Sequence, residues 1–379
     1  MPIIGILKES EGENRVAALP EITAQLVKMG FEVMVENGAG ERAFASDEDY
    51  NSQGAKTVDK DTVLSSSDVI LKIISLTKEE IDKLKSGAVV LAILQPFFNT
   101  ETVYHLLDRN ITGFSLETIP RTTRAQSMDV LSSQATVAGY KAVLLAASNL
   151  PKFFPMFMTA AGSITPAKVL ILGAGVAGLQ SISTARRLGG VVEAFDTRSA
   201  VKEEVQSLGA KFVEVEGAKD EASAGGYAVE QTEEFKQKQR QVIHDHAVKS
   251  DVIITTAQIP GRKAPVLITK ETVAGMKNGS VIVDLAASTG GNCELTKNNE
   301  TVVSGGVKII GNSNLPSTVP FDASKMFGKN VLNFLKLILN EGKINLNFED
   351  DLVKGTCITH NKEIINQKLK ESIAAQPAN

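Results

Sequence analysis

Residues 169–196 (VLILGAGVAGLQSISTARRLGGVVEAFD) contain the pattern that most constrains the fold of this chain. The apolar run Val169–Leu172 predicts a buried strand, and a helix is expected from the glycines that follow up to Arg187. Val191–Phe195 predicts a second strand, with Asp196 at its end. A strand, a G-x-G-x-x-G turn, a helix and a second strand ending in an acid are typical of the βαβ unit that binds dinucleotides. A parallel sheet with helices on both faces is therefore expected.

Each glycine of this pattern has a steric task. Gly173 permits the tight turn from strand to helix, Gly175 lets the backbone approach a pyrophosphate without an intervening Cβ, and Gly178 lets the helix pack closely on the strand. The unpaired N–H groups and the positive dipole end of the helix would then hold the phosphates. The predicted contacts are Gly173, Ala174, Gly175, Val176 and Gly178. The alternative is a βαβ turn that binds no phosphate.

Asp196 distinguishes between the two nicotinamide dinucleotides. A carboxylate accepts a hydrogen bond from the 2′-hydroxyl of the adenosine ribose but repels a 2′-phosphate. Two unit charges about 4 Å apart, at an effective dielectric constant of about 20, repel by roughly 4 kcal/mol. NAD(H) is therefore the predicted cofactor, although Arg198, two residues further on, would soften the discrimination. Thr197 and Arg198 are included in the predicted cofactor site.

Short apolar runs, separated by polar segments with helical patterning, extend over most of the chain. Before the glycine pattern they lie at Ile3–Leu7, Glu32–Val35, Val69–Ile74, Ala88–Leu94 and Ile111–Leu116. After it they lie at Lys211–Val215, Val252–Thr256, Val281–Leu285 and Val307–Ile310. This alternation predicts the α/β fold class, with two doubly wound, Rossmann-like parallel sheets.

Two domains are expected because 379 residues are too many for one compact core. Two long helices are predicted to join them, one at Met128–Asn149 and one with an apolar stripe that ends at Ile338, for which Gly342 is the expected C-cap. Strand-like runs beyond it, at Ile344–Phe348 and Thr356–Thr359, are expected to return to the first domain. The predicted domains are residues 1–134 with 325–379, and residues 135–324, with NAD bound in the cleft between them.

Composition and charge exclude several classes of function. The 40 basic and 44 acidic residues give a net charge of −4. The sequence has no stripe of basic residues, so a nucleic-acid partner is not expected. Cys293 and Cys357 are too few for a disulfide framework or a thiolate metal site, and no metal is expected. His244 and His246 should diverge on one helix and be solvated. The chain opens into a strand without a signal segment, and its longest apolar run, Ala88–Leu94, is too short to span a bilayer, so a cytoplasmic location is expected.

A polar block, Pro120–Gln134 (PRTTRAQSMDVLSSQ), follows the end of a predicted strand and opens a helix. Because open α/β sheets bind ligands at the carboxyl ends of their strands, the block is a candidate site. Asp129 and Ser132 are three residues apart and should share one helix face. The polar side chains concentrated in the block are Arg121, Arg124, Gln126, Asp129 and Ser132. The alternative is a capped helix start with solvated charges.

The block, with RAQSMDVLSSQ preceded by Pro120-Arg121, resembles the signature of the NAD(H)-binding component (domain I) of proton-translocating nicotinamide nucleotide transhydrogenases. Further motifs of that family occur as GYKAV (139–143), MTAAGSITPAKVLILGAGVAGLQ (158–180), GGYA (225–228), TTAQIPGRKAPVLIT (255–269) and SVIVDLAASTGGNCE (280–294). The resemblance extends over nearly the whole chain.

The resemblance implies roles at the nicotinamide end of the cofactor. An Arg, a Gln and an Asp of the family's block lie at the nicotinamide ribose and match Arg121, Gln126 and Asp129, while Ser132 matches a serine on the nicotinamide side. The implied reaction is direct hydride transfer from NADH on this chain to NADP⁺ on a partner domain, coupled to proton movement across the membrane. The implied partners are a second copy of the chain, a membrane-domain subunit and an NADP(H)-binding beta subunit, at the inner face of the cytoplasmic membrane.

The resemblance also implies further contacts with the nucleotide. Tyr227 matches a tyrosine that folds over the bound nucleotide, and its small neighbours, including Gly226, suit a mobile lid. Gln239 matches another contact on the following helix. Ala257 and Gln258 lie in the segment TTAQIPG, where family members usually carry leucine at the position of Gln258.

Alanine dehydrogenase, which shares the two-domain fold, is the main alternative. Arg15 and Lys72 match its substrate-binding Arg and Lys, but Ile93 and Ser288 stand where its catalytic histidine and aspartate would fall. Neither replacement can move the proton that amine oxidation requires, so Arg15 and Lys72 are interpreted as structural. A pure NAD-sensing module is the third possibility, and the polar block at the nicotinamide end argues against it.

Overall fold

The chain forms two compact units, which are described separately below. The computed structural model describes residues 1–215, 233–258, 262–340 and 342–374. Unit 1 comprises Met1–Gln134 and Pro316–Asn379, and unit 2 comprises Ala135–Leu315. The helix α6 (Val130–Asn149) carries the chain from unit 1 into unit 2. The return falls before Pro316, earlier in the sequence than the residue 325 expected above.

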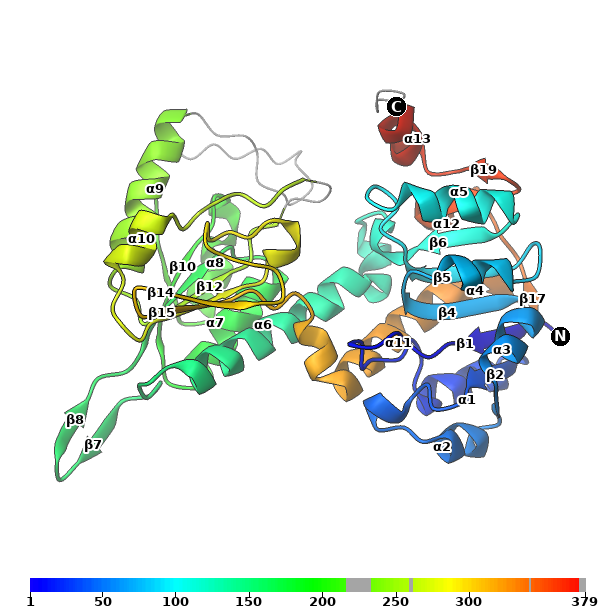
Figure 1. The fold of residues 1–379 in the computed structure, drawn as a ribbon, viewed down its shortest axis with the longest axis horizontal. Coiled ribbons are helices and arrows are strands. Elements are labelled where there is room, and N and C mark those ends of the chain that lie inside the picture. The colour runs from blue at the N-terminus through cyan, green and yellow to red at the C-terminus, as the bar shows by residue number, and fades with distance from the viewer. Residues whose placement is uncertain (216–232, 259–261, 341, 375–379) are drawn as a thin grey trace. The chain divides into compact units, whose positions relative to one another are not determined.

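Unit 1 is built on an eight-stranded sheet of order β19-β18-β6-β5-β4-β1-β2-β3 (Figure 1). Its parallel strands are β1 (Ile3–Ile6), β2 (Glu32–Glu36), β3 (Lys56–Val58), β4 (Val69–Ile74), β5 (Val89–Ile93) and β6 (Thr112–Ser115). At one edge β18 (Cys357–His360) pairs antiparallel with β6, and β19 (Glu363–Ile364) pairs antiparallel with β18. The C-terminal segment therefore completes the sheet that the N-terminus begins.

Two cores cover the two faces of this sheet, because alternate residues of each strand point to opposite sides. On one face Ile4 and Leu71 pack with α1 (Pro20–Lys28), α2 (Asp47–Ser52) and α11 (Pro320–Ile338). On the other face Ile70 and Val90 pack with α3 (Lys60–Ser66), α4 (Lys78–Asp82), α5 (Thr100–Asp108) and α13 (Gln367–Ala374). Burial on both faces explains why these strands read as continuous apolar runs.

Unit 2 contains a seven-stranded sheet of order β11-β10-β9-β12-β13-β15-β14. Its parallel strands are β9 (Lys168–Leu172), β10 (Val191–Phe195), β11 (Lys211–Phe212), β12 (Val252–Thr255), β13 (Val281–Asp284) and β15 (Val307–Ile310), with β14 (Thr301–Ser304) antiparallel. One face is covered by α6, α7 (Val176–Arg187) and α8 (Lys202–Ser207), the other by α9 (Glu233–Ala247) and α10 (Lys270–Gly275). The predicted α/β class with two mostly parallel sheets is confirmed.

The expected C-cap of α11 was wrong. The helix ends at Ile338, and its C-cap is Leu339, whose backbone is extended. Leu339–Asn340 (β16) then pairs antiparallel with Lys343–Ile344 (β17), and Gly342, with a φ of 71°, lies in the connection between them. The strand expected over Ile344–Phe348 is therefore limited to its first residue, and α12 (Asp351–Thr356) precedes β18.

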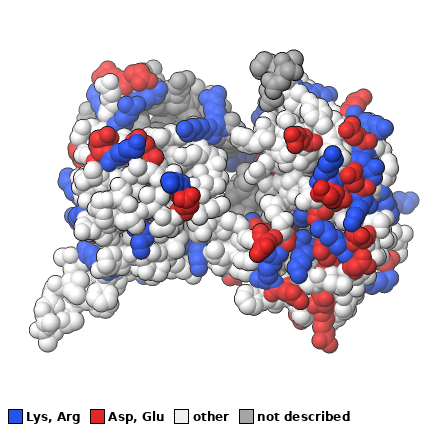
Figure 2. Space-filling view, viewed as in Figure 1, with Lys and Arg blue, Asp and Glu red and all other residues white. Residues whose placement is uncertain are grey.

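A hairpin that the sequence did not predict projects from unit 2 (Figure 1). It consists of β7 (Phe157–Thr159) and β8 (Gly162–Ile164), all of whose residues are exposed. Large apolar side chains gather here, with Met158 78% exposed and Met156 61% exposed. Figure 2 shows no charged side chain on this hairpin, whereas acidic and basic side chains are intermixed over the visible face of each unit.

Among the described residues, α6 is long and apolar enough by composition to cross a membrane. Its residues Ala142, Val143 and Ala146 are fully buried in a core of unit 2. Gly139 lets the backbones of α6 and α7 approach closely, since a Cβ at this position would lie 2.2 Å from the Ala177 carbonyl oxygen. The Ser181 hydroxyl also donates to the Gly139 carbonyl at 3.0 Å. The helix is thus part of the packing of this unit.

Candidate nucleotide-binding site

The carboxyl edge of the unit 2 sheet has a topological switch point. β9 lies between β10 and β12 and pairs in parallel with both, because the chain runs from β9 through β10 to β11 on one side and then returns to β12 on the other. Open α/β sheets bind ligands outside the strand ends at such a point. The loops that follow these strands carry predicted cofactor contacts, at 173–178 after β9, 196–198 after β10 and 257–258 after β12.

The turn between β9 and α7 requires glycine at two positions. Gly173 has a φ of 101°, and a Cβ there would lie 2.5 Å from Oγ1 of Thr256, whose hydroxyl donates to the Gly173 carbonyl at 3.0 Å. A Cβ at Gly178 would lie 1.9 Å from the same carbonyl oxygen, so α7 begins in direct contact with the turn. A Cβ at Gly175 would meet nothing within 4 Å. This open space at the N-terminus of the 12-residue helix α7 fits a phosphate group.

Asp196 follows β10 directly, and its side chain is 8% exposed. Its Oδ2 accepts the N–H of Ala174 at 2.7 Å, which ties the end of β10 to the glycine turn. Arg198 binds the same carboxylate through Nε at 2.9 Å, through Nη2 at 2.8 Å and through its backbone N–H at 2.9 Å. The hydrogen bond with Asp196 raises the pKa of the Arg198 guanidinium, which stays charged. Thr197, between them, is half-buried.

Two residues that the sequence reasoning missed organise the loop after β12. Asn292 is fully buried and holds Ala257 from both sides: its Oδ1 accepts the Ala257 N–H at 3.0 Å, and its Nδ2 donates to the Ala257 carbonyl at 2.8 Å. Asp284, at the end of β13, is also fully buried and accepts the N–H of Asn292 at 2.7 Å. Gln258 is exposed and donates through Nε2 to the carbonyl of Leu285 at 2.8 Å. An acid at the end of a parallel strand was the available signal for Asp284.

The remaining predicted contacts of unit 2 are less fully described. Gln239 lies on α9 and is half-buried, whereas Gly226 and Tyr227 lie outside the described residues. The expectation that His244 and His246 are solvated was wrong, although they do diverge. Nδ1 of His244 lies 3.0 Å from Oγ1 of Thr272, and Nδ1 of His246 lies 2.6 Å from a carboxylate oxygen of Glu193. Both histidines join α9 to neighbouring elements of the unit.

The polar block belongs to unit 1 and starts with a 3₁₀ helix at Thr123–Met128, so the helix α6 begins only at Val130. Asp129 therefore precedes α6 and caps it, and the expected shared helix face was wrong. Its Oδ1 accepts the Ser132 N–H at 2.9 Å, and its Oδ2 accepts the Ser132 hydroxyl at 2.6 Å. The contacts of Asp129 are those of the capped helix start considered above. Arg121 and Gln126 have exposed side chains.

Neighbouring elements of unit 1 anchor this block. Asn330 and Asn333 of α11 both donate to the carbonyl of Ser127, at 2.8 and 3.0 Å. Arg124 is half exposed and forms ion pairs with Asp350 and Asp351 at the start of α12. Its hydrogen bond lowers the pKa of Asp350. The 3₁₀ helix with Gln126 is thus fixed at its centre by α11 and α12.

Comparison with known proteins identifies the family. The model of the alanine dehydrogenase/PNT N-terminal domain matches residues 5–138, and that of the C-terminal domain matches residues 142–367. The chain belongs to the alanine dehydrogenase/PNT family. It is similar to an NAD(P) transhydrogenase alpha subunit of Rhodospirillum rubrum, with 48% identity over 97% of this chain and 98% of that protein. It also matches the crystal structure of transhydrogenase from Sinorhizobium meliloti, with a TM-score of 0.89 and 44% identity over 96% of this chain and all of that one.

Within the alanine dehydrogenase/PNT family, the transhydrogenase members are the nearer relatives. Alanine dehydrogenase of Staphylococcus haemolyticus is 28% identical over 89% of this chain and 87% of its own length. The resemblance to the transhydrogenase component, recognised from the polar block and the glycine pattern, is confirmed.

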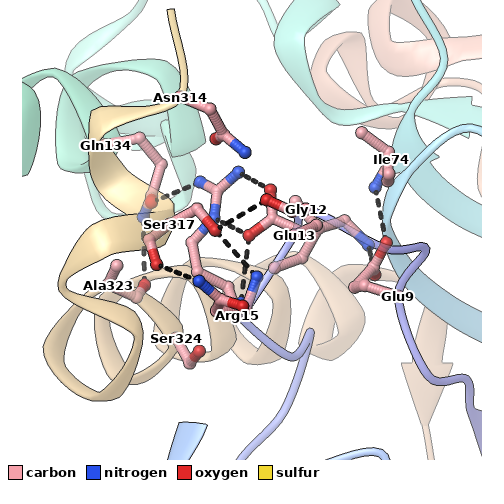
Figure 3. A network of polar contacts seen from close by, with 12 residues as sticks. Glu9, Gly12, Glu13, Arg15, Ile74, Gln134, Asn314, Ser317, Ala323 and Ser324 are labelled. Atoms are coloured by element: carbon pink, nitrogen blue, oxygen red, sulfur yellow. Dashed lines mark hydrogen bonds and ion pairs between the residues drawn. The ribbon is translucent and has the colours of Figure 1, made fainter. Parts of the chain in front are cut away.

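The two residues that match alanine dehydrogenase's substrate-binding positions are occupied by internal contacts. Figure 3 shows the Arg15 guanidinium between Glu13 and Gln134. It donates to Glu13 through Nε at 2.8 Å and through Nη2 at 2.6 Å, and to Oε1 of Gln134 at 2.7 Å. Lys72, on β4, is 1% exposed and pairs with Glu80 at 2.8 Å. These contacts agree with the structural interpretation of both residues. Among the described residues, no cluster of His, Cys, Asp and Glu is suited to a metal ion.

Proposed function

We propose that this chain binds NAD(H) at the carboxyl edge of the unit 2 sheet and exchanges hydride with NADP(H) held on a partner domain. It would act as the NAD(H)-binding subunit of a proton-translocating transhydrogenase, beside a membrane-domain subunit and an NADP(H)-binding beta subunit at the inner face of the membrane. The observation that carries the proposal is the contact of Asp196 with the glycine turn through Ala174. It puts a ribose acceptor next to the phosphate-binding end of α7.

The groups that would hold the nucleotide lie on three loops of unit 2. The open space at Gly175 and the backbone N–H groups at the start of α7 bind the pyrophosphate. The Asp196 carboxylate accepts hydrogen bonds from the adenosine ribose. Ala257, fixed by Asn292, lines the site from the loop after β12. Gly226, Tyr227 and Gln239 are proposed as further contacts on the strength of the family motif.

Hydride transfer between two nicotinamides moves no substrate proton. NADH supplies a hydride that ends on NADP⁺, so the products are NAD⁺ and NADPH, and no general acid or base is required at the reacting carbons. The task of the protein is to hold the two rings aligned at about 3–3.5 Å. Arg121, Gln126, Asp129 and Ser132 are proposed to position the nicotinamide and its ribose.

A single-turnover experiment tests this function. The chain loaded with NADH is mixed with the NADP(H)-binding subunit loaded with NADP⁺, and NADPH formation is followed by stopped flow. We expect rapid transfer only when that subunit is added, and no oxidation of alanine or reduction of pyruvate by the chain alone. Turnover with alanine in the absence of the partner would favour the alternative, an alanine dehydrogenase-like amino-acid dehydrogenase. Failure to bind NADH would exclude both.

A second copy of this chain is the proposed partner of the β7–β8 hairpin, giving the homodimer. The hairpin has no charged residue, and the side chains of Phe157 and Met158 on it and of Met156 directly before it are exposed. Phe153 and Phe157 form an edge-to-face pair with centroids 4.7 Å apart, which stiffens the base of the hairpin. Exposed apolar surface of this kind is typical of a protein interface.

Sedimentation of the chain and of the double variant F157S/M158S tests the dimer. We expect a dimer for the native chain and a folded monomer for the variant. The matched control is Val303→Ser, because Val303 is also an exposed apolar residue of unit 2 but lies on β14, away from the hairpin. A monomeric native chain that binds the isolated membrane-domain subunit through the hairpin would refute the second copy as its partner.

A further inference from the structure

In this structure the acceptor positions of the Asp196 carboxylate are already engaged by Ala174 and Arg198. Oδ1 accepts the backbone N–H and the Nε–H of Arg198, and Oδ2 accepts the N–H of Ala174 and the Nη2–H of Arg198. A carboxylate offers about four lone-pair positions, and all four are engaged here. A ribose diol can therefore bind Asp196 only if it replaces the guanidinium of Arg198.

The backbone contacts and the side-chain contacts of this carboxylate differ in how easily they are exchanged. The N–H groups of Ala174 and Arg198 belong to the turn itself and keep Asp196 in place. The Arg198 side chain is 26% exposed and can leave by a change of rotamer. It precedes the 3₁₀ helix Ser199–Val201. Glu204, the other acid that interacts with Arg198, lies on α8 and remains available to the guanidinium.

We propose that Arg198 sets the cofactor selectivity of this site. Its guanidinium can bind a 2′-phosphate, but Asp196 holds it and prevents this contact. The same guanidinium competes with the ribose of NAD(H) for the Asp196 carboxylate. The inference rests on the nucleotide site proposed above. A guanidinium binds phosphate through two parallel hydrogen bonds, and it would lie beside the 2′ position wherever Asp196 contacts the ribose. Asp196 excludes the phosphate in two ways, by direct repulsion and by retaining Arg198.

Binding of adenosine fragments to four forms of the chain tests this assignment. Calorimetric titration with 5′-AMP and with 2′,5′-ADP isolates the adenosine end from the nicotinamide. We expect Asp196→Ala to bind 2′,5′-ADP about ten- to a hundredfold more tightly than the native chain does, because a hydrogen bond between charged groups has roughly this effect. The double variant D196A/R198A should lose that gain. Arg198→Ala alone should bind 5′-AMP at least as tightly as the native chain, because the competitor is removed.

Arg187→Ala is the matched control, since it removes the same charge at the exposed far end of α7. It should leave both affinities unchanged. If Asp196→Ala does not fold, Asp196→Asn removes the charge and keeps one acceptor oxygen, which can still accept the N–H of Ala174. The gain with 2′,5′-ADP should also shrink as salt is raised, because it is electrostatic.

Two results would overturn the assignment. One is a double variant that binds 2′,5′-ADP as tightly as Asp196→Ala; the other is a tenfold loss of 5′-AMP affinity in Arg198→Ala. Either result, with NADH still bound tightly by the native chain, leaves the proposed function intact. A native chain that binds neither NADH nor 5′-AMP would refute the nucleotide site itself.

Discussion

The pair Asp129 and Ser132 allows the structural and the functional role of one carboxylate to be separated. Oδ1 of Asp129 accepts the Ser132 N–H at 2.9 Å and caps α6, and Oδ2 accepts the Ser132 hydroxyl at 2.6 Å. Loss of an N-cap lowers stability by about 1–2 kcal/mol. We therefore expect Asp129→Ala to lower the free energy of unfolding by about this amount, and Asp129→Asn to have little effect, because asparagine caps as well as aspartate.

The second contact determines where the Ser132 proton points. While the carboxylate holds that proton, Oγ can offer only its lone pairs to a ligand, and a nicotinamide carboxamide N–H₂ is a suitable donor. Asp129→Asn turns an amide N–H₂ toward Oγ, which must then accept from it and point its own proton outward. Loss of one such hydrogen bond in the transfer geometry amounts to about 1 kcal/mol, or roughly a five- to tenfold slower hydride transfer, with NADH affinity little changed.

Urea unfolding and single-turnover stopped flow with the NADP(H)-binding subunit measure the two effects. Ser132→Ala is the control, since it removes the hydroxyl but keeps the N–H that Asp129 caps. It should slow transfer like Asp129→Asn while unfolding like the native chain. Transfer at the native rate in Asp129→Asn would refute the role of the hydroxyl orientation, and equal destabilisation by alanine and asparagine would refute the cap.

Three further predictions concern other parts of the fold. Gly178→Ala should lower thermal stability strongly, because its Cβ would lie 1.9 Å from a backbone oxygen, whereas Gly175→Ala should unfold normally but bind NADH more weakly in a titration. Burial raises the pKa of Glu9 to about 7, so its contribution to stability is present below pH 4.5 and is lost as the pH rises to about 7. In urea unfolding from pH 5 to 8, the free energy of unfolding of Glu9→Gln should therefore exceed that of the native chain by an amount that grows with pH, to the order of 3 kcal/mol. A difference that does not change with pH would contradict the role of Glu9. Asn292→Ala removes three hydrogen bonds, two of them to Ala257, and should lower both stability and NADH affinity, whereas unchanged affinity would exclude Asn292 from positioning the site.

The strands that the sequence predicted are those buried on both faces. Val191–Phe195 and Val69–Ile74 were predicted with the bounds that they have in the structure, because a parallel strand between two helical layers is apolar throughout. The strands that were missed are short, or lie at a sheet edge or outside the sheets. Lys56–Val58 is an edge strand, and every residue of Phe157–Thr159 is exposed, so neither forms a buried apolar run.

The glycine turn could be read from the sequence because its contacts are local. Gly173 and Gly178 meet each other across four residues, and the pattern records that contact directly. Asn292 could not be found this way, since its partner Ala257 is 35 residues away in the sequence. Asn292 binds backbone atoms of Ala257, and such a contact does not require a particular side chain at that position. The pairing of His246 with Glu193, 53 residues apart, was hidden for the same reason.

The parallel strands of the two sheets follow the same order, but the loops at the two switch points differ. In unit 1, β1 lies between β2 and β4, as β9 lies between β10 and β12 in unit 2. Glu9, in the loop after β1, is 4% exposed and accepts the backbone N–H groups of Ile73 and Ile74 at the end of β4. The Glu9 carboxyl group thus lies against the end of β4 and occupies the loop after β1. In unit 2 the corresponding turn leaves open space at Gly175. The turn after β9 in unit 2, unlike the loop after β1 in unit 1, therefore leaves room for the dinucleotide that is proposed to bind there.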